Sequence, residues 1–412
     1  MGAFSVFKDR KSKKNKETPS VESHYIRLAK ITAFSKYFVL LLLILFAVYA
    51  FSFHSDVVTM DNFRYMLKFI NLGEEAEATE GSIITFDTHE NNKGLSFKGD
   101  MCIYNENTVT IMGWDGDVLA GGELGYDHPK AVENGKNVFC CDIGGNELSV
   151  YTSITNVLVQ TYDYPISWIA ASESGNYAVV SSTKGYRSAI FVYDIHFRNI
   201  YTLQISDKYV DFIDMTADGN YFYTLSHHSS GGNLVTQVSK YTVASTDTRP
   251  LFTDEYIGEL PLGVYCTDYG YAVLTSGGIR TYDGENNLIG FVPSKGREIL
   301  SCHIGSRYSV LAFGTEGLSG GNELNVYGSD GKLVSSREFS ATPADYTVAD
   351  DMLYTVSQGV LTVVDLTGNS DDVSYDVSTD ITHLVTDDGR LILFSPYKAE
   401  IFSKNNYSEA EQ

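Results

Sequence analysis

The sequence predicts an all-β fold, a closed β-propeller of four-stranded blades that follows one N-terminal transmembrane helix. Three observations lead to this prediction: an uncharged apolar run near the N-terminus, a series of short strands after it, and an internal repeat. The repeat starts lie roughly 37 to 47 residues apart, a period typical of propeller blades.

The apolar run covers Tyr37 to Phe53 without a charge. His54 and Ser55 extend it, and Asp56 is the first charged residue after it. This length is just enough to cross a hydrocarbon core of about 30 Å as a helix. A cleaved signal peptide is the alternative, but its apolar region is shorter and begins closer to the N-terminus. The residues predicted to mark the span are Tyr37, Phe38, Leu42, Leu45, Tyr49 and Phe53.

Charge is distributed unevenly along the 412 residues, whose formal net charge is -22. Residues 1–36 hold nine Lys/Arg and three Asp/Glu, which leaves 21 basic and 49 acidic residues for the remainder. Because basic flanks stay in the cytoplasm, we expect residues 54–412 outside the cell membrane. The acidic body argues against nucleic acid and suits cations or basic partners.

After the run, TMDNFRYMLKFINLG predicts a short juxtamembrane helix with one apolar stripe, and Glu74 to Gly81 form an acidic linker. From Ser82 onward, short runs with alternating apolar residues are separated by turn residues, and Asp-Gly occurs five times. Asp-Gly between apolar runs is a strong hairpin signal.

Four hairpins share one plan, in which a turn with a glycine joins two apolar strands: SWIAASESGNYAVVSS, DFIDMTADGNYFYTLS, VYCTDYGYAVLTS and THLVTDDGRLILFS. A second, looser hairpin follows each one. The steady glycine indicates a positive φ in the turn. The structural turn glycines are predicted to be Gly175, Gly219, Gly270 and Gly389, with Glu173 and Ser174 exposed near one rim of the ring.

The number of strands suggests how the ring closes. The last unit, Ile381 to Ser403, supplies three strands, and the early strand Ser82 to Asp87 has no unit of its own. We expect this strand to complete the last blade, which would remove the exposed sheet edges. This gives eight blades; seven is the alternative if the GLSFKGDMCIYNE unit is irregular.

This layout resembles the WD40-like and quinoprotein-like propellers. It also resembles a family of bacterial membrane proteins with a basic cytoplasmic tail, one span, a linker helix and an outer propeller. The resemblance implies a fold and a location, and no activity. No repeat ends its third strand in Trp-Asp, and the Trp-containing docking motif of the quinoprotein propellers is missing.

The sequence identifies no catalytic, cofactor-binding or metal-binding residue. His227-His228, read as part of a Gly/Ser-rich loop, lacks further ligands, and Cys302-His303 would face opposite sides of a strand. The five cysteines have no disulfide or zinc spacing and are expected to be buried. The acidic pairs are Asp350-Asp351, Asp371-Asp372 and Asp387-Asp388, all expected in turns, and the candidate stacking aromatics are Trp114, Tyr162, Tyr164, Trp168 and Tyr269.

Two functions follow from these observations. The first is a non-catalytic binding or scaffolding module on the outer face of the cell membrane, whose partner is another envelope protein, a glycan or a peptide. The alternative is an envelope enzyme, a glycan hydrolase or lyase or a quinone-type redox protein, with its site at the propeller channel. The predicted parts are a cytoplasmic tail (1–36), the span (37–55), helix and linker (56–81), the propeller (82–403) and a flexible tail (404–412).

Overall fold

The computed structural model describes residues 32, 34–46, 48, 79–244, 247–314, 322–339, 343–387 and 389–406. The chain divides into two units, Met1–Met66 and Leu67–Gln412. In the first unit, residues 32, 34–46 and 48 are helical and exposed, and they include Tyr37, Phe38, Leu42 and Leu45 of the predicted span. Within the described residues, no helix has the length and apolar character needed to cross a membrane. Tyr49, Phe53, the basic tail up to residue 31 and the predicted juxtamembrane helix lie outside the described residues.

The described residues of the second unit form eight antiparallel sheets of four strands each, and this confirms the predicted eight-bladed propeller. We call the strands of a blade A to D in sheet order. Blades 1 to 4 comprise β2 (Lys93–Phe97), β3 (Asp100–Tyr104), β4 (Thr108–Met112), β5 (Val118–Glu123); β6 (Pro129–Glu133), β7 (Val138–Asp142), β8 (Glu147–Tyr151), β9 (Asn156–Thr161); β10 (Trp168–Ala171), β11 (Tyr177–Thr183), β12 (Tyr186–Tyr193), β13 (Asn199–Ile205); and β14 (Tyr209–Met215), β15 (Tyr221–Ser230), β16 (Asn233–Thr242), β17 (Phe252–Ile257).

Blades 5 to 8 continue in the same order. They comprise β18 (Pro261–Thr267), β19 (Gly270–Thr275), β20 (Gly278–Asp283), β21 (Leu288–Pro293); β22 (Glu298–Ile304), β23 (Tyr308–Gly314), β24 (Asn322–Gly328), β25 (Leu333–Phe339); β26 (Asp345–Ala349), β27 (Met352–Ser357), β28 (Val360–Asp365), β29 (Val373–Asp376); and β30 (His383–Asp387), β31 (Arg390–Phe394), β32 (Lys398–Ile401) with β1 (Ile83–Thr85). The GLSFKGDMCIYNE segment is a regular part of blade 1, so the seven-bladed alternative is wrong.

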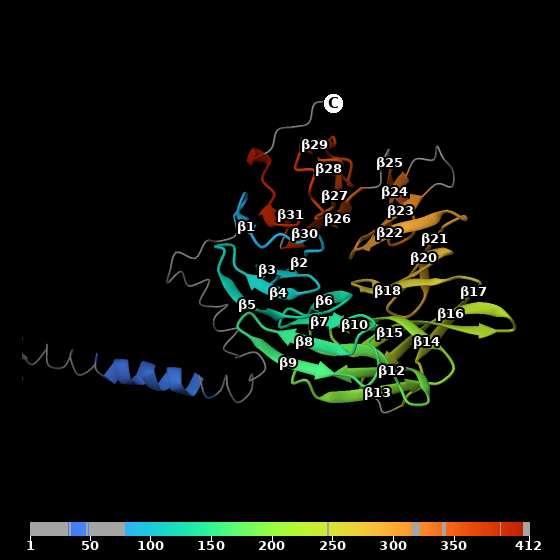
Figure 1. Cartoon of the computed structure of the whole chain (residues 1–412), viewed down its shortest axis with the longest axis horizontal. Helices are drawn as coiled ribbons and strands as arrows, with labels where there is room; N and C mark the ends of the chain where they lie inside the picture. The colour runs from blue at the N-terminus through green and yellow to red at the C-terminus, as the bar shows by residue number, and fades with distance from the viewer. Residues whose placement is uncertain are drawn as a thin grey trace, which may run out of the picture. The chain divides into compact units, whose positions relative to one another are not determined.

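Blade 8 closes the ring as the strand count predicted. β1 pairs antiparallel with β32 and serves as strand D of this blade, with Ile84 opposite Ala399. Figure 1 shows the blue β1 beside the red strands of blade 8, although the two segments come from opposite ends of the propeller sequence. Ile84 is 1% exposed, and the Gly81 N–H donates to the Ile401 carbonyl at 2.9 Å.

The A strands of successive blades lie next to one another around the ring, among them β6 and β10, β10 and β14, β26 and β30, and β30 and β2. We name the two faces of the ring by their turns. The AB face carries the turns from strand A to strand B, and the BC face carries the turns from strand B to strand C. Since β1 runs antiparallel to β32, the chain enters the propeller at the AB face, and it leaves there through the 3-10 turn Lys404–Asn406.

Eight clusters of buried apolar side chains hold the described blades together, and each cluster joins two neighbouring blades. Aromatic stacks cross several of these interfaces. Tyr177 of blade 3 lies 4.6 Å from Phe139 of blade 2 between ring centroids, and Tyr271 of blade 5 lies 4.1 Å from Tyr223 of blade 4. Tyrosine suits these positions because its large ring fills the wedge between two twisted sheets.

The cysteines are free thiols that belong to this packing or lie beside it. Cys140 and Cys141 lie on opposite faces of β7, one in the cluster between blades 1 and 2 and the other in the cluster between blades 2 and 3. The adjacent pair therefore contributes to two different interfaces, as the alternation of side chains along a strand requires.

Candidate functional site

The histidine pair weighed as a metal candidate does not lie in a loop. His227 and His228 are both part of β15, and only Gly231 and Gly232 form the turn to β16. The prediction of a loop was wrong because the Ser/Gly-rich segment continues a long hairpin in which Ser230 still pairs with Asn233. Nδ1 of His227 lies 2.7 Å from Asp211 Oδ2, whereas His228, as the next strand residue, points to the other face.

The pair Cys302 and His303 lies in β22, where successive side chains also point to opposite faces. Cys302 Sγ lies 3.4 Å from the Tyr265 hydroxyl. Burial raises the pKa of the Cys302 thiol and lowers the pKa of His303, so both groups favour their neutral forms. Across the described parts of the chain, no three His, Cys, Asp or Glu side chains are arranged to hold a metal ion.

Two of the three acidic pairs lie in separate connections between strands. Asp350 and Asp351 form the turn from β26 to β27 with positive φ, and Asp371 and Asp372 lie between β28 and β29. Asp387 is the last residue of β30 rather than a turn residue, because it pairs with Arg390, and Asp388 lies outside the described residues.

The candidate aromatic residues pack within or between blades. Trp114 is buried between blades 8 and 1, and its Nε1 donates to the Gly99 carbonyl at 3.0 Å. Tyr162 lies 3.2 Å from Tyr193, hydroxyl to hydroxyl. Trp168 meets Phe212 edge to face at 4.8 Å. Tyr164 is 36% exposed, and Tyr269 lies in the turn from β18 to β19.

A pocket of about 560 Å³ opens on the AB face over blades 3, 4 and 5, and we call it the acidic pocket. Its walls are the A-to-B turns of these three blades, which include the segments that the sequence showed as repeats. The lining residues are Ala171, Ser172, Glu173, Asp214, Met215, Thr216, Ala217, Asp218, Cys266, Thr267 and Asp268. Four of them carry carboxylates and none carries a positive charge, so the lining is acidic, and Lys130 and Lys240 act on Asp214 and Asp218 from outside the lining.

The turns of blades 3 and 4 interlock at this pocket. The Ser174 N–H donates to the Ala217 carbonyl at 2.9 Å, and Asn176 Nδ2 donates to the Gly219 carbonyl at 3.3 Å. Gly219 has φ +67°, and a Cβ at this position would overlap the hydroxyl of Ser174 and lie 2.8 Å from Asn176 Nδ2. Glycine is therefore needed here both for the backbone conformation and for the close approach of the two turns.

The other turn glycines also adopt positive φ, +103° at Gly175, +149° at Gly270 and +74° at Gly389. The Gly175 N–H donates to the Ser172 carbonyl at 2.9 Å and so closes the turn. Glu173, in the middle of the same turn, is exposed.

Asp214 is the least accessible carboxylate of the acidic pocket. Its Oδ2 accepts the Cys266 N–H of blade 5 at 2.7 Å, and its Oδ1 accepts the Met215 N–H at 2.9 Å. Burial raises the pKa of Asp214 to about 6. Asp345 of blade 7 makes the same two bonds, to Leu384 N of blade 8 and to Tyr346 N, each at 2.8 Å. The repetition shows that Asp214 joins neighbouring A strands and is part of the architecture.

The remaining carboxylates of the acidic pocket, Glu173, Asp218 and Asp268, are exposed. Hydrogen bonds from Thr216 Oγ1 at 2.6 Å and from the Asn220 N–H at 3.0 Å hold the pKa of Asp218 below its usual range. Asp218 therefore keeps its negative charge at neutral pH and below. These three side chains can reach a cationic group that enters from solvent.

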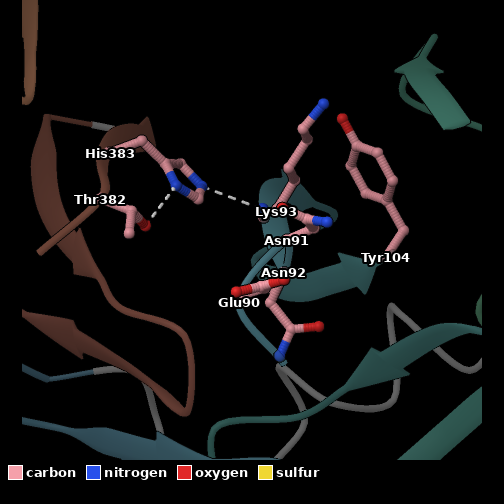
Figure 2. A pocket seen from close by; sticks show the side chains of 8 residues that line it. Glu90, Asn91, Asn92, Lys93, Tyr104, Thr382 and His383 are labelled. Carbon is pink, nitrogen blue, oxygen red and sulfur yellow. Dashed lines mark hydrogen bonds between the residues drawn. The ribbon is translucent and has the colours of Figure 1, made fainter. Parts of the chain in front are cut away.

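A second pocket, of about 380 Å³, lies on the BC face at the junction of blades 8 and 1 (Figure 2). We call it the seam pocket, and it is lined by Glu90, Asn91, Asn92, Lys93, Gly94, Tyr104, Thr382 and His383. The repeat pattern gave no indication of this pocket, because its residues do not repeat and come from both ends of the propeller. The one signal in the sequence was the polar segment Asn91-Asn92-Lys93 at the start of β2.

His383 joins the two blades that form the seam pocket. Its Nε2 accepts the Gly94 N–H at 2.9 Å, and its Nδ1 lies 3.1 Å from Thr382 Oγ1 (Figure 2). The ring packs on Phe394 with 4.2 Å between centroids. Burial lowers the pKa of His383 to about 4, with a smaller contribution from Lys93. The imidazole is therefore neutral at physiological pH, and Nε2 serves as a hydrogen-bond acceptor.

The chain belongs to the DUF5711 family, a family of unknown function, and matches it over residues 76–402. No match was found among curated proteins. The fold is similar to that of Sqt1 from Saccharomyces cerevisiae, with a TM-score of 0.56 and 9% identity over 79% of this chain and 99% of that one. It is also similar to BamB from Moraxella catarrhalis, with a TM-score of 0.52 and 12% identity over 80% of this chain and 98% of that one. At this identity the similarity shows a shared propeller fold.

Proposed function

We propose that this member of the family is a non-catalytic binding module, and that it binds a basic segment of a partner protein in the acidic pocket. The observation that carries the proposal is a pocket of about 560 Å³ whose lining has the exposed carboxylates Glu173, Asp218 and Asp268 and no cation, with Lys240 acting on Asp218 only from outside the lining. A Lys or Arg side chain would satisfy these carboxylates through charge-assisted hydrogen bonds.

Binding is favoured over catalysis by the role of Asp214. Two carboxylates with separated pKa values in one pocket are a pattern typical of acid–base enzymes, and Asp214 and Asp218 have this pattern. However, both oxygens of Asp214 accept backbone N–H groups, and Asp345 repeats the arrangement away from the pocket. Burial raises the pKa of Asp214 although these hydrogen bonds lower it, and both oxygens are already occupied in joining neighbouring A strands.

We also propose that residues 37–55 anchor the chain in the cell membrane, with the propeller on the outer side and residues 1–36 in the cytoplasm. The support is the uncharged run and the basic residues that precede it. Alkaline phosphatase is active only after export, so a fusion after residue 412 should be active. A fusion after residue 30 should be inactive, and the reverse pattern would contradict the proposed orientation.

Peptide binding tests the acidic pocket directly. The full chain in non-ionic detergent is titrated against a fluorescent peptide of alternating Lys and Ser, and against a Glu/Ser peptide of the same length. We expect only the basic peptide to bind, with an affinity that falls as salt is added. The triple variant Glu173→Gln, Asp218→Asn, Asp268→Asn should bind at least about tenfold more weakly, since charged hydrogen bonds are lost.

A matched triple variant controls for the overall charge of this acidic protein. Glu123→Gln, Glu255→Gln and Glu285→Gln remove three exposed carboxylates that do not line the pocket. This variant should bind as the original chain does. Equal loss in the two triple variants would mean that the peptide responds only to net charge, and the proposed site would then be wrong.

A photo-crosslinking amino acid can locate a natural partner on the same face. Ala217 is exposed and lines the pocket, whereas Ser306 is exposed in the equivalent turn of blade 6. We expect a specific crosslinked protein from position 217 and none from position 306, and the crosslink should be lost when Asp218→Lys is added. Crosslinks of equal yield at the two positions would contradict binding at the acidic pocket.

A further inference from the structure

The BC face carries positively charged side chains, although residues 37–412, which include the propeller, hold 49 acidic and 21 basic residues. Lys93 begins β2 and lines the seam pocket, and Tyr104 is its direct partner across the β2–β3 pair. Directly opposed side chains share one face of a sheet with Cβ atoms about 5 Å apart. In Figure 2 the ammonium of Lys93 and the hydroxyl of Tyr104 lie at the same end of the pocket, and the Glu90 carboxylate lies at the other end.

Lys130, near the start of β6 in the next blade, adds a second ammonium group. Its Nζ lies 3.6 Å from the centre of the Trp168 ring, which holds the side chain against blade 3. Burial lowers the pKa of Lys130, Lys93 lowers it further by repulsion, and the Cys141 thiol and the Asp214 carboxylate act in the opposite direction. Lys130 therefore lies within electrostatic range of both Lys93 and Asp214, and an anion beside Lys93 would reduce the repulsion between the two ammonium groups.

The other polar groups of the seam pocket fit an anion as well. Burial raises the pKa of Tyr104 well above its ordinary value, so its phenol stays protonated and can donate a hydrogen bond. The ring nitrogens of His383 are committed to Gly94 and Thr382, and the side-chain nitrogen of Asn92 donates to the carbonyls of Asp87 and Pro396. Asn91 donates to Glu106, and the Tyr104 hydroxyl interacts with the backbone of Ala131 but keeps its own proton. Lys93 and Tyr104 are therefore lining groups with donor capacity for a ligand.

We propose that the seam pocket binds a small oxyanion group, a carboxylate or a phosphate, between Nζ of Lys93 and the hydroxyl of Tyr104, with Lys130 strengthening the positive potential. The site lies on the opposite face from the acidic pocket and over different blades, and Lys130 is within electrostatic range of both pockets, through Lys93 and through Asp214. The volume of about 380 Å³ accommodates the anionic group together with a small organic portion of the ligand.

Isothermal titration calorimetry on the full chain in non-ionic detergent, at low ionic strength, tests this site with inorganic phosphate in one arm and acetate in the other. We expect saturable binding of at least one anion, and the arm that binds identifies the group. Lys93→Met should weaken binding about tenfold or more, and Tyr104→Phe about threefold to tenfold, as expected for a charged and a neutral hydrogen bond.

Lys184→Met is the matched control, since Lys184 is an exposed lysine on the BC face of blade 3 that does not line the pocket. It should change the affinity less than about twofold. If Lys93→Met unfolds, Lys93→Arg keeps the charge and should retain binding while Tyr104→Phe still weakens it. The proposal is overturned if neither anion binds, or if Lys184→Met weakens binding as much as Lys93→Met.

Discussion

The acidic pocket and the seam pocket are built in opposite ways. The acidic pocket is made by one turn design used in three successive blades, and its outer carboxylates are left free to solvent. The seam pocket is made where the two ends of the propeller meet, and its His383 and Asn92 hydrogen-bond across the junction. The comparison shows that the repeated A-to-B turns keep the same backbone while their exposed side chains differ from blade to blade. The residues at the junction of blades 8 and 1 do not repeat, and they join the two ends of the propeller.

The largest expected effect is at the closing strand. Ile84→Ala removes a fully buried side chain and should lower the free energy of unfolding by about 3 to 4 kcal/mol. Ile213→Ala, equally buried between blades 3 and 4, should cost a similar amount. Only Ile84→Ala should also produce dimers and larger species in size-exclusion chromatography, because loss of β1 exposes the edge of β32. Monomeric Ile84→Ala would show that β1 is not needed to protect that edge.

The next largest effect is a dependence of the free energy of unfolding on pH, caused by His383 of the seam pocket. Above about pH 7 His383 is neutral in both states, so it adds no pH dependence. Between about pH 6.5 and 4 the unfolded chain binds a proton that the folded chain, with its lowered pKa, does not. The free energy of unfolding should therefore fall by about 2 to 3 kcal/mol as the pH decreases through this range. Urea unfolding at pH 7.5 and pH 4.5 measures this loss.

His383→Gln isolates this contribution, since Gln can accept the Gly94 hydrogen bond and does not titrate. The free energy of unfolding of the original chain should exceed that of His383→Gln by less as the pH falls, because only the original chain loses stability through His383. The contributions of the carboxyl groups that both proteins share cancel in this difference. If the difference in the free energy of unfolding between the two proteins does not change with pH, the pH dependence belongs to groups other than His383.

A smaller effect is expected where the turns of the acidic pocket interlock. Gly219→Ala should cost about 2 kcal/mol, from the positive φ and from the overlap with Ser174. Gly185→Ala has a similar φ of +87° and open space around it, so it should cost about 1 kcal/mol. Equal losses of unfolding free energy in the two variants would mean that the contact between Gly219 and the blade 3 turn contributes nothing beyond the positive φ.

The smallest effects separate the two kinds of carboxylate in the acidic pocket. Asp214→Asn replaces an acceptor oxygen with a donor and should cost about 1 kcal/mol, because one backbone N–H loses its partner and the cost of burying the charge is removed. Glu173→Gln and Asp268→Asn should change the free energy of unfolding by less than about 0.5 kcal/mol. A large loss in either of these variants would give the exposed carboxylates a structural role.

The architecture was readable from the sequence, and the sites were readable only in part. Gly175 and Gly219 recur with the same flanking apolar runs, so the turn, the blade and the blade count follow from local pattern. The exposure of Glu173 was also predictable from its turn. The sequence did not predict that one pocket is surrounded by Glu173, Asp218 and Asp268, because this arrangement depends on how adjacent blades pack.

The seam pocket was harder to predict from the sequence than the acidic pocket. His383 and Gly94 are separated by most of the propeller, and their hydrogen bond exists only after closure. The pair His227-His228 shows the opposite error, in which a Ser/Gly-rich composition suggested a loop although the backbone continues as a paired strand.

The position of β1 also constrains how the protein is made. Ile84 is among the first propeller residues to leave the ribosome, and its partner Ala399 is among the last. Blades 1 to 7 can assemble in order during synthesis, but blade 8 must wait until the whole propeller has been translated. A chain released early would keep Ile83 to Thr85 exposed, and this unpaired apolar strand would mark it as incomplete to chaperones and proteases.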